Sequence, residues 1–330
     1  MNKIPVGVIG VGRLGSLHAK MYSQISSADF VGVYDTNHDL ATKIAAEYHV
    51  KAFASLEEFL ANVRAANVVT PTKTHFEIAC QALECGVHVF IEKPITATVD
   101  EAARLLELAA RKNCKIQVGH IERFNPALIA LQKYELKPMF IESHRLAQFD
   151  PRGTDVAVVL DLMIHDIDVI LTLVHSPVRD IQANGVPIVS GNIDIANARI
   201  QFENGCVANV TASRISQKKM RKMRLFQKDA YITIDFAGGT AQVFRLIDAD
   251  SQQAVSGMVV GNITAGGVAK KIVFDTPNVA EVNALKYELE LFIDAVRNNM
   301  KPVVDGADGL RALEVAHRII ETIRKQQIVL

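Results

Sequence analysis

The stretch Val6-Gly7-Val8-Ile9-Gly10-Val11-Gly12-Arg13-Leu14-Gly15 decides the fold of this 330-residue chain. It predicts an apolar strand that runs into a Gly-x-Gly-x-x-Gly turn and then into a helix over residues 16–23. Gly10 permits the tight turn, Gly12 lets a pyrophosphate approach the backbone, and Gly15 lets helix and strand pack closely. The N–H groups at the start of the helix then face the phosphates.

A second apolar strand, Phe30–Tyr34, ends in Asp35, which follows Gly15 by twenty residues. In a dinucleotide-binding fold this carboxylate accepts hydrogen bonds from the ribose hydroxyls of the adenosine. It would repel a 2′-phosphate, and neither Thr36 nor Asn37 can neutralise one. The sequence therefore predicts a site for NAD rather than NADP.

The composition is that of an ordinary globular protein. Lys+Arg and Asp+Glu both number 36, so net charge favours neither nucleic acid nor an anionic membrane surface as a partner. We see no apolar run long enough to span a bilayer and no secretory leader, and we expect a cytoplasmic protein. The four cysteines are scattered without metal-site or redox spacing, so we predict reduced thiols and no metal: Cys80, Cys85, Cys114 and Cys206.

Strand and helix patterns alternate from Ile4 to about Gln117. This alternation predicts a doubly wound parallel sheet, with ligands at the carboxyl ends of its strands. Each predicted strand ends in a candidate contact: Gly10, Asp35, Thr70-Pro71-Thr72, Glu92-Lys93-Pro94 and Gly119-His120. We therefore assign residues 1–120 to a dinucleotide-binding Rossmann domain.

Lys93 is the most informative of these strand-end residues. Pro94 restricts the backbone of Lys93 to extended conformations and thereby holds the lysine stiffly. An ordinary surface lysine ahead of a turn has the same local sequence, and the sequence does not decide whether the Lys93-Pro94 bond is cis.

The pattern changes after residue 120. Strand patterns without intervening helices predict a largely antiparallel sheet, and hence an α+β domain over 121–330. The predicted strands are 180–183, 193–202, 207–214, 223–227, 231–235 and 240–246. We expect a mobile loop at 251–267 and helices at 282–298 and 310–325, of which the last could pack back on the first domain. The basic run Lys218–Arg224 is interpreted as a solvated strand edge, with an anion-binding rim as the alternative.

Asp161 and His165 lie four residues apart in a predicted helix over 155–174, and therefore on one face. A carboxylate that fixes the tautomer of a histidine makes that histidine a suitable general base. A surface Asp–His pair on a helix is the structural alternative.

In combination these motifs resemble the glucose–fructose oxidoreductase / inositol dehydrogenase (Gfo/Idh/MocA) family over essentially the whole chain. The resemblance rests on residues 10–15, Thr70-Pro71-Thr72 with His75, Glu92-Lys93-Pro94 and 161–165. It implies NAD as cofactor and a subunit contact through the open face of the second sheet, giving a homodimer or homotetramer. The cofactor-binding residues that it implies are Gly10, Gly12, Arg13, Leu14, Gly15, Asp35, Thr70, Pro71, Thr72, His75, Glu92 and Lys93.

The same resemblance implies a dehydrogenase that oxidises a secondary alcohol on a sugar. Nicotinamide would accept hydride while His165, oriented by Asp161, removes the hydroxyl proton. Lys93 would stabilise charge on the same oxygen, or would itself be the base if burial lowers its pKa.

Residues 118–126 and 159–168 look like the branch of the family that acts at C3 of UDP-N-acetylhexosamines, although Met163 replaces a residue that is small in many members. We expect His120 and Asn125 near the sugar. Arg123, Arg145 and Arg152 would bind the diphosphate through paired hydrogen bonds. Alternatively, these arginines are solvated or pair with Asp150, Asp155 and Glu142.

Two other functions stay open from the sequence. One is a dehydrogenase of a free polyol or simple sugar, as in other branches of the family. The other is a regulator that binds NAD without turnover. A regulator has no need of a proton-transfer set, and the presence of Lys93, Asp161 and His165 together argues against it.

Overall fold

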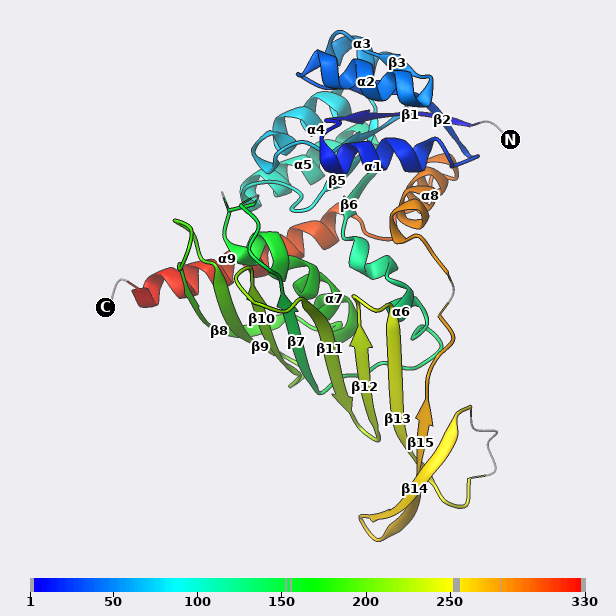
Figure 1. Ribbon diagram of the computed structural model, residues 1–330, viewed down its shortest axis with the longest axis vertical. Coiled ribbons are helices and arrows are strands. Elements are labelled where there is room, and N and C mark those ends of the chain that lie inside the picture. The colour runs from blue at the N-terminus through cyan, green and yellow to red at the C-terminus, as the bar shows by residue number, and fades with distance from the viewer. Residues whose placement is uncertain (1–2, 152, 155, 252–255, 280, 328–330) are drawn as a thin grey trace. The chain divides into compact units, whose positions relative to one another are not determined.

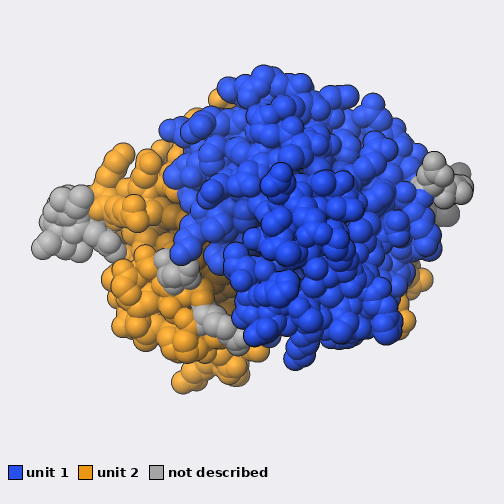
Figure 2. All heavy atoms as spheres, turned by 90° about the horizontal axis from the view of Figure 1, so that it is seen from above, with its two compact units in different colours: residues 1–121, 283–314 blue, residues 122–282, 315–330 orange. Residues whose placement is uncertain are grey.

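The computed structural model describes residues 3–151, 153–154, 156–251, 256–279 and 281–327 (Figure 1). The chain divides into two compact units, which Figure 2 colours separately. Unit 1 comprises residues 1–121 and 283–314, and unit 2 comprises residues 122–282 and 315–330. The first boundary lies next to the expected one, but residues 283–314 group with unit 1 rather than with the second domain.

Unit 1 is built on a six-stranded parallel sheet with the order β3-β2-β1-β4-β5-β6, which confirms the predicted doubly wound fold. Its strands are β1 (Ile4–Ile9), β2 (Ala28–Tyr34), β3 (Lys51–Ala52), β4 (Ala65–Val68), β5 (His88–Glu92) and β6 (Ile116–Gly119). The strand order reverses between β1 and β4. Ligands of such sheets bind outside the carboxyl ends of the strands at this point.

The helices of unit 1 are α1 (Arg13–Tyr22), α2 (His38–Tyr48), α3 (Leu56–Leu60), α4 (His75–Glu84), α5 (Val99–Lys112), α8 (Ala284–Arg297) and the first part of α9 (Gly306–Gln327). Local sequence explains where several begin. The Asn37 side chain accepts the Leu40 N–H at the start of α2, and Thr98 and Glu101 form a capping box at the start of α5.

One hydrophobic core of unit 1 joins α1, α2 and α8 to β1 and β2. Val6 and Val8 of β1 contribute to it, since alternate residues of a strand face the same side. The contribution of α8 comes from one helical face, Leu289, Phe292, Ile293 and Val296. Helix α8 is therefore part of the first unit's own interior.

Unit 2 contains a nine-stranded sheet in the order β14-β15-β13-β12-β11-β7-β10-β9-β8. All neighbours are antiparallel except β7 and β10, which confirms the α+β prediction. The strands are β7 (Phe140–Leu146), β8 (Val178–Val186), β9 (Ile195–Phe202), β10 (Val207–Ser213), β11 (Met220–Gln227), β12 (Ala230–Asp235), β13 (Thr240–Asp248), β14 (Met258–Ala265) and β15 (Val268–Asp275).

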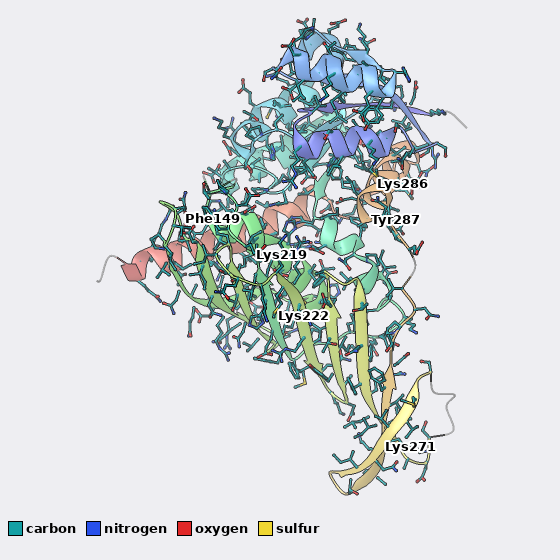
Figure 3. The ribbon with its side chains drawn as sticks, in the orientation of Figure 1. Phe149, Lys219, Lys222, Lys271, Lys286 and Tyr287 are labelled. Carbon is teal, nitrogen blue, oxygen red and sulfur yellow. The ribbon has the colours of Figure 1, made fainter. Side chains whose placement is uncertain are left out.

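Two expectations for this sheet were wrong. Residues 258–265 form strand β14 instead of a mobile loop, because β14 pairs with β15 across a turn in which Gly266 and Gly267 have positive φ. The basic run at Lys218–Arg224 does not lie at a sheet edge. It enters β11, which is hydrogen-bonded to β12 on one side and β7 on the other (Figure 3).

One face of the nine-stranded sheet is covered by helices of unit 2. The short helix α6 (Pro126–Ile129) packs on β12 and β13, while α7 (Ile164–Val174) packs on β7 and β10. The residues of β7 alternate accordingly: Ile141, Ser143 and Arg145 are buried beneath the helices. The opposite face carries half-buried and exposed side chains.

Candidate active site

The glycine turn of unit 1 has the geometry that a bound pyrophosphate requires. A Cβ on Gly15 would lie 1.8 Å from the Gly10 carbonyl oxygen, so only glycine fits there. Gly10 has a φ of 83° and lies against Val69. A Cβ on Gly12, by contrast, would meet nothing within 4 Å. Gly12 is the N-cap residue of α1, and no side chain caps the first N–H groups of this helix. These N–H groups border the open space beside Gly12, where a phosphate could accept from them.

Asp35 connects this turn to the end of β2. One carboxylate oxygen accepts the Val11 N–H at 2.7 Å, and the other accepts the Asn37 N–H at 2.8 Å. Each oxygen has further acceptor capacity, because a carboxylate offers about four lone-pair sites. The residues present therefore fit NAD: Asp35 would take the ribose hydroxyls, and the turn with the exposed Arg13 and Leu14 would take the phosphates.

We expect wild-type protein to bind NADH more tightly than NADPH, and Asp35→Ser to narrow the difference mainly by weakening NADH binding. The loss should be about 1.5–3 kcal/mol, the usual size for hydrogen bonds to a charged group. Fluorescence titration with both cofactors gives the dissociation constants. Asp39→Ser removes the same charge from an exposed position in α2 and serves as control. Tighter binding of NADPH by the wild type would contradict the assignment of Asp35.

The loops that follow β4 and β5 are joined by His75. Its ring nitrogens lie 2.8 Å from the carbonyl oxygen of Thr70 and 2.9 Å from that of Pro94. Burial lowers the pKa of His75, although both carbonyls act in the opposite direction. His75 is thus placed behind the predicted cofactor contacts Thr70, Pro71 and Thr72, where it supports their loop.

Lys93 follows β5 directly, and its bond to Pro94 is cis, which answers the question that the sequence left open. The Lys93 N–H donates to the carboxylate of the preceding Glu92. That carboxylate is also 3.1 Å from Nε2 of His18, a completely buried residue of α1. The predicted cofactor and catalytic residues of unit 1 thus all lie at or beside the carboxyl ends of its strands.

In unit 2, Asp161 and His165 occupy one helical segment, as predicted. The segment begins with a π-helical turn, η3 (Val159–Met163), and continues as α7. It starts later than the expected residue 155, because Val158 donates its N–H to Ile193 and the carbonyl groups of Gly153 and Val156 are bound by Arg214. Both Asp161 and His165 are half-buried, and π-helical turns occur often at functional sites.

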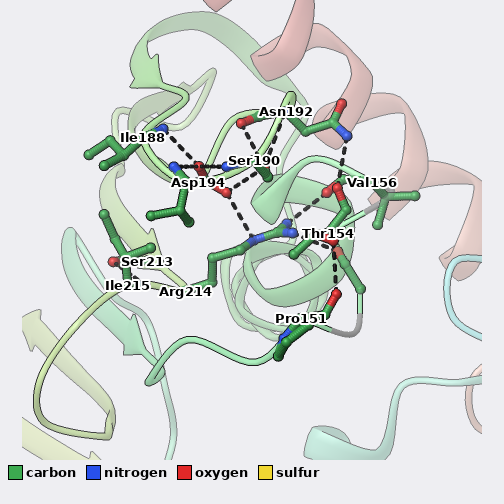
Figure 4. Close-up of polar contacts among 12 residues, drawn as sticks. Pro151, Thr154, Val156, Ile188, Ser190, Asn192, Asp194, Ser213, Arg214 and Ile215 are labelled. Atoms are coloured by element: carbon green, nitrogen blue, oxygen red, sulfur yellow. Dashed lines mark hydrogen bonds and ion pairs between the residues drawn. The ribbon is translucent and has the colours of Figure 1, made fainter.

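The loop ahead of Asp161 is held by a buried cluster (Figure 4). Arg214 donates to the carbonyls of Gly153 at 2.6 Å and Val156 at 2.7 Å, and Asn192 donates to that of Thr154. Burial alone would raise the pKa of Asp194 beside Arg214, but hydrogen bonds from the Ser190 hydroxyl and the N–H groups of residues 188–190 lower it well below its usual value. Gly153 has a φ of 76°, which glycine adopts without strain, and a Cβ there would lie 3.1 Å from the Asp161 carboxylate.

Arg145, predicted as a diphosphate contact, is paired with two carboxylates in this structure. Its guanidinium is buried and donates to both oxygens of Asp166, at 2.7 and 3.2 Å, and to Glu122 at 2.8 Å. Burial alone would lower the pKa of Arg145, but these two carboxylates raise it above its ordinary value. The reason for the difference is that Asp166 lies on the buried face of α7, directly above β7.

Arg123 is held by an ion pair and Asn125 by neutral and charged hydrogen-bond partners. Arg123 donates through two nitrogens to Asp168, at 2.7 and 2.6 Å. The Asn125 amide nitrogen donates to Glu122 and to the Phe236 carbonyl, and its oxygen caps α6. Arg123 and Arg145 thus pair with Asp168 and Asp166 of α7, whereas Asn125 holds the start of α6. Asp155, one of the carboxylates considered as an alternative partner, lies outside the described residues. His120 is buried, and Arg152 lies outside the described residues.

Sequence reasoning missed four partners in these clusters: His18, Glu122, Asp166 and Asp168. One signal was present for two of them. Asp166 and Asp168 alternate with Ile167 and Val169 in a mostly apolar helix. An acidic residue at a buried helix position needs a cationic partner or several hydrogen-bond donors, so polar partners for both could be expected from elsewhere in the chain.

Within the described part of the chain, no group of three or more His, Cys, Asp or Glu side chains is arranged to hold a metal ion. Within the same residues, no helix has both the length and the apolar character that crossing a membrane demands. The four cysteines are free thiols.

Comparison with known proteins agrees with this geometry. The model of the Gfo/Idh/MocA oxidoreductase family for its NAD-binding Rossmann fold matches residues 4–120, and that for its C-terminal alpha/beta domain matches residues 144–329. A UDP-N-acetylglucosamine 3-dehydrogenase of Acidithiobacillus ferrooxidans is 38% identical over 314 residues, or 95% of each chain. A scyllo-inositol 2-dehydrogenase (NAD(+)) of Bacillus subtilis is 27% identical over 95% of this chain and 92% of its own length.

A solved structure of the Acidithiobacillus ferrooxidans 3-dehydrogenase matches this structure with a TM-score of 0.88 and 36% identity, over 98% of this chain and 99% of that chain. The match extends over both units. The family models together leave only short segments unmatched. The chain therefore belongs to the Gfo/Idh/MocA family of NAD-binding oxidoreductases.

Proposed function

We propose that this oxidoreductase uses NAD to oxidise the C3 hydroxyl of a UDP-N-acetylhexosamine. The observation that carries the proposal is the 38% identity, over 95% of both chains, to a UDP-N-acetylglucosamine 3-dehydrogenase. Lys93, Asp161 and His165 supply the acid–base groups that such an oxidation needs. Three inositol dehydrogenases among the relatives, 24–27% identical over at least 95% of this chain, make a free polyol the second candidate.

In the proposed mechanism NAD, when bound, supplies the hydride acceptor. His165 removes the proton of the hydroxyl, and Asp161 keeps the imidazole in the tautomer that can accept it. Lys93 donates a hydrogen bond to the same oxygen and stabilises the negative charge that develops there. Arg123 and Arg145 act indirectly, because their ion pairs with Asp168 and Asp166 fix α7 and hence His165.

The same proposal includes a homo-oligomer formed through the open face of the nine-stranded sheet. A continuous row of five half-buried rings crosses this face, with neighbouring centroids 4.8–6.0 Å apart: Phe140, Phe226, Tyr231, Phe244 and Phe274. Beside it lie two ion pairs, Arg224–Glu142 and Lys222–Asp235. Half-exposed aromatic residues flanked by charges are typical of subunit interfaces.

The substrate is tested by NADH formation with purified protein and NAD. UDP-N-acetylglucosamine and UDP-N-acetylgalactosamine are compared with free N-acetylglucosamine, inositol and glucose. We expect turnover with a UDP-sugar, and a raised KM for it in Arg152→Ala with unchanged NADH affinity, because the guanidinium would bind phosphate.

The other outcomes decide among the alternatives. If the protein oxidises inositol or glucose but neither binds nor oxidises the UDP-sugars, the proposal is wrong. The protein is then a dehydrogenase of a free polyol or simple sugar. NADH that stays bound without turnover of any of these compounds would favour a regulator.

A further inference from the structure

A chain of side-chain hydrogen bonds runs through the interior of unit 1 from Tyr22 to Glu92. The Tyr22 hydroxyl lies 2.6 Å from the Asn67 side-chain oxygen. The Asn67 amide nitrogen lies 2.9 Å from Nδ1 of His18, and Nε2 of His18 lies 3.1 Å from Glu92. Tyr22, Asn67 and His18 are at most 1% exposed. Such a chain is stable only if each donor meets an acceptor, because an unmatched buried group costs about 1–3 kcal/mol.

The chemistry of the groups sets the direction of this chain. A carboxylate can only accept, so the His18 nitrogen that faces Glu92 must carry a proton. Nδ1 of a neutral imidazole is then an acceptor, and it meets the N–H of the Asn67 amide. The amide oxygen is left to accept from the Tyr22 hydroxyl. Every bond is matched with His18 as the Nε2–H tautomer, whereas the opposite tautomer would place two acceptors face to face at Glu92.

Glu92 transmits this arrangement to the strand end. One oxygen of its carboxylate faces His18, while the other accepts the backbone N–H of Lys93 at 3.2 Å. A Cβ on Gly119 of β6 would lie 2.8 Å from the same carboxylate, so glycine leaves the room that it occupies. Burial alone would raise the pKa of Glu92, but the hydrogen bond from His18 and the charge of Lys93 lower it below its usual value.

We infer that His18 is a positioning residue for Lys93, acting through Glu92, and that Asn67 and Tyr22 hold His18 in the tautomer that this role requires. The inference rests on the proposed use of Lys93 at the substrate oxygen. The physical basis is that the Glu92 carboxylate accepts the backbone N–H of Lys93, so a shift of this carboxylate would shift that backbone. His18 of α1, itself bound by Asn67 of β4, keeps the carboxylate in place from the interior of unit 1. Errors of about 1 Å in the placement of a catalytic group can cost about 100-fold in rate.

The first test compares two substitutions of His18. His18→Leu removes both polar atoms, and we expect kcat to fall by about 10- to 100-fold with little change in NADH affinity. His18→Gln keeps a donor and an acceptor at the end of a side chain of similar reach, and should recover most of the loss. His88→Leu is the matched control, since His88 lies at the opposite end of β5 and should leave kcat unchanged.

The second test is a double-mutant cycle. If His18 acts through Glu92, His18→Leu combined with Glu92→Gln should be no slower than the slower single variant, because coupled residues are not additive. Additive losses would overturn the inference, as would equal losses in His18→Leu and His18→Gln or a normal kcat in His18→Leu. Thermal unfolding of each variant separates these results from a general loss of stability.

A third readout does not depend on any substrate. In full-length protein labelled with 15N-histidine, the signals absent from His18→Gln belong to His18. We expect a protonated Nε2 and an unprotonated Nδ1. An Nδ1–H tautomer or a doubly protonated ring in the wild type would overturn the inference. If the tautomer is as expected but Lys93→Ala retains full turnover, the proposed function of Lys93 fails instead.

Discussion

His165→Ala is expected to lower kcat by about 100-fold or more, the usual effect of removing a positioned acid–base group. NADH affinity should change little, because the NAD-binding turn and Asp35 belong to unit 1 and His165 belongs to unit 2. Steady-state kinetics with the UDP-sugar and a separate NADH titration measure the two effects. Asp161→Asn should lower kcat less than His165→Ala, since its proposed task is to orient the imidazole rather than to accept the proton.

His144→Ala provides the matched control for this prediction. His144 is a half-buried histidine of the same unit, on the open face of β7, and it should leave kcat unchanged. Lys93→Ala is expected to be about as damaging as His165→Ala, because it removes the stabilisation of the developing oxyanion. Near-normal turnover of His165→Ala at neutral pH would show that His165 is not the base and would assign that role to Lys93.

Asp166→Ala should lower the free energy of unfolding of unit 2 by about 3–5 kcal/mol, as expected when one partner of a buried ion pair is removed. The Arg145 guanidinium would stay buried between β7 and α7. Of its two carboxylate partners, Asp166 and Glu122, Glu122 alone would be left. Denaturant titration followed by circular dichroism measures the shift, and NADH binding reports whether unit 1 stays folded.

The control for this second prediction is Glu142→Ala. It breaks the partly exposed pair with Arg224 on the other face of the same sheet and should cost no more than about 1 kcal/mol. If Asp166→Ala were no more damaging than Glu142→Ala, the Arg145 cluster would not be a determinant of stability. Arg145 would then be available for the diphosphate contact that its sequence position first indicated.

The first half of the fold could be predicted because its signals are local. The apolar residues of β1, the three glycines and the strand ending at Asp35 lie within about thirty residues, and each restricts the backbone directly. Strand β7 escaped prediction because Glu142, Ser143, His144 and Arg145 interrupt its apolar residues. Two of these four side chains, Ser143 and Arg145, are buried by contacts with distant parts of the chain, and no local pattern records such contacts.

For the candidate site, sequence reasoning found the residues of the motifs but not those that hold them. Lys93, Asp161 and His165 stand in recognisable patterns. Arg145 looked like a substrate ligand because a guanidinium suits a phosphate and a carboxylate equally well, and its partner Asp166 is 21 residues away. His18 sits inside a helix where nothing in the spacing points to Glu92, 74 residues later. Pairings at such separations depend on the topology of the sheet.

The contribution of α8 to unit 1 has a consequence for folding during synthesis on the ribosome. Residues 1–121 emerge first, yet Leu289, Phe292, Ile293 and Val296 complete the core around β1 and α1. Until the whole of 122–282 has been synthesised, the nascent first unit therefore keeps an apolar surface open. Exposed surface of this kind is what chaperones bind and what leads to aggregation at high concentration. The cofactor-binding unit is begun first, but its core is complete only after most of unit 2 has been synthesised.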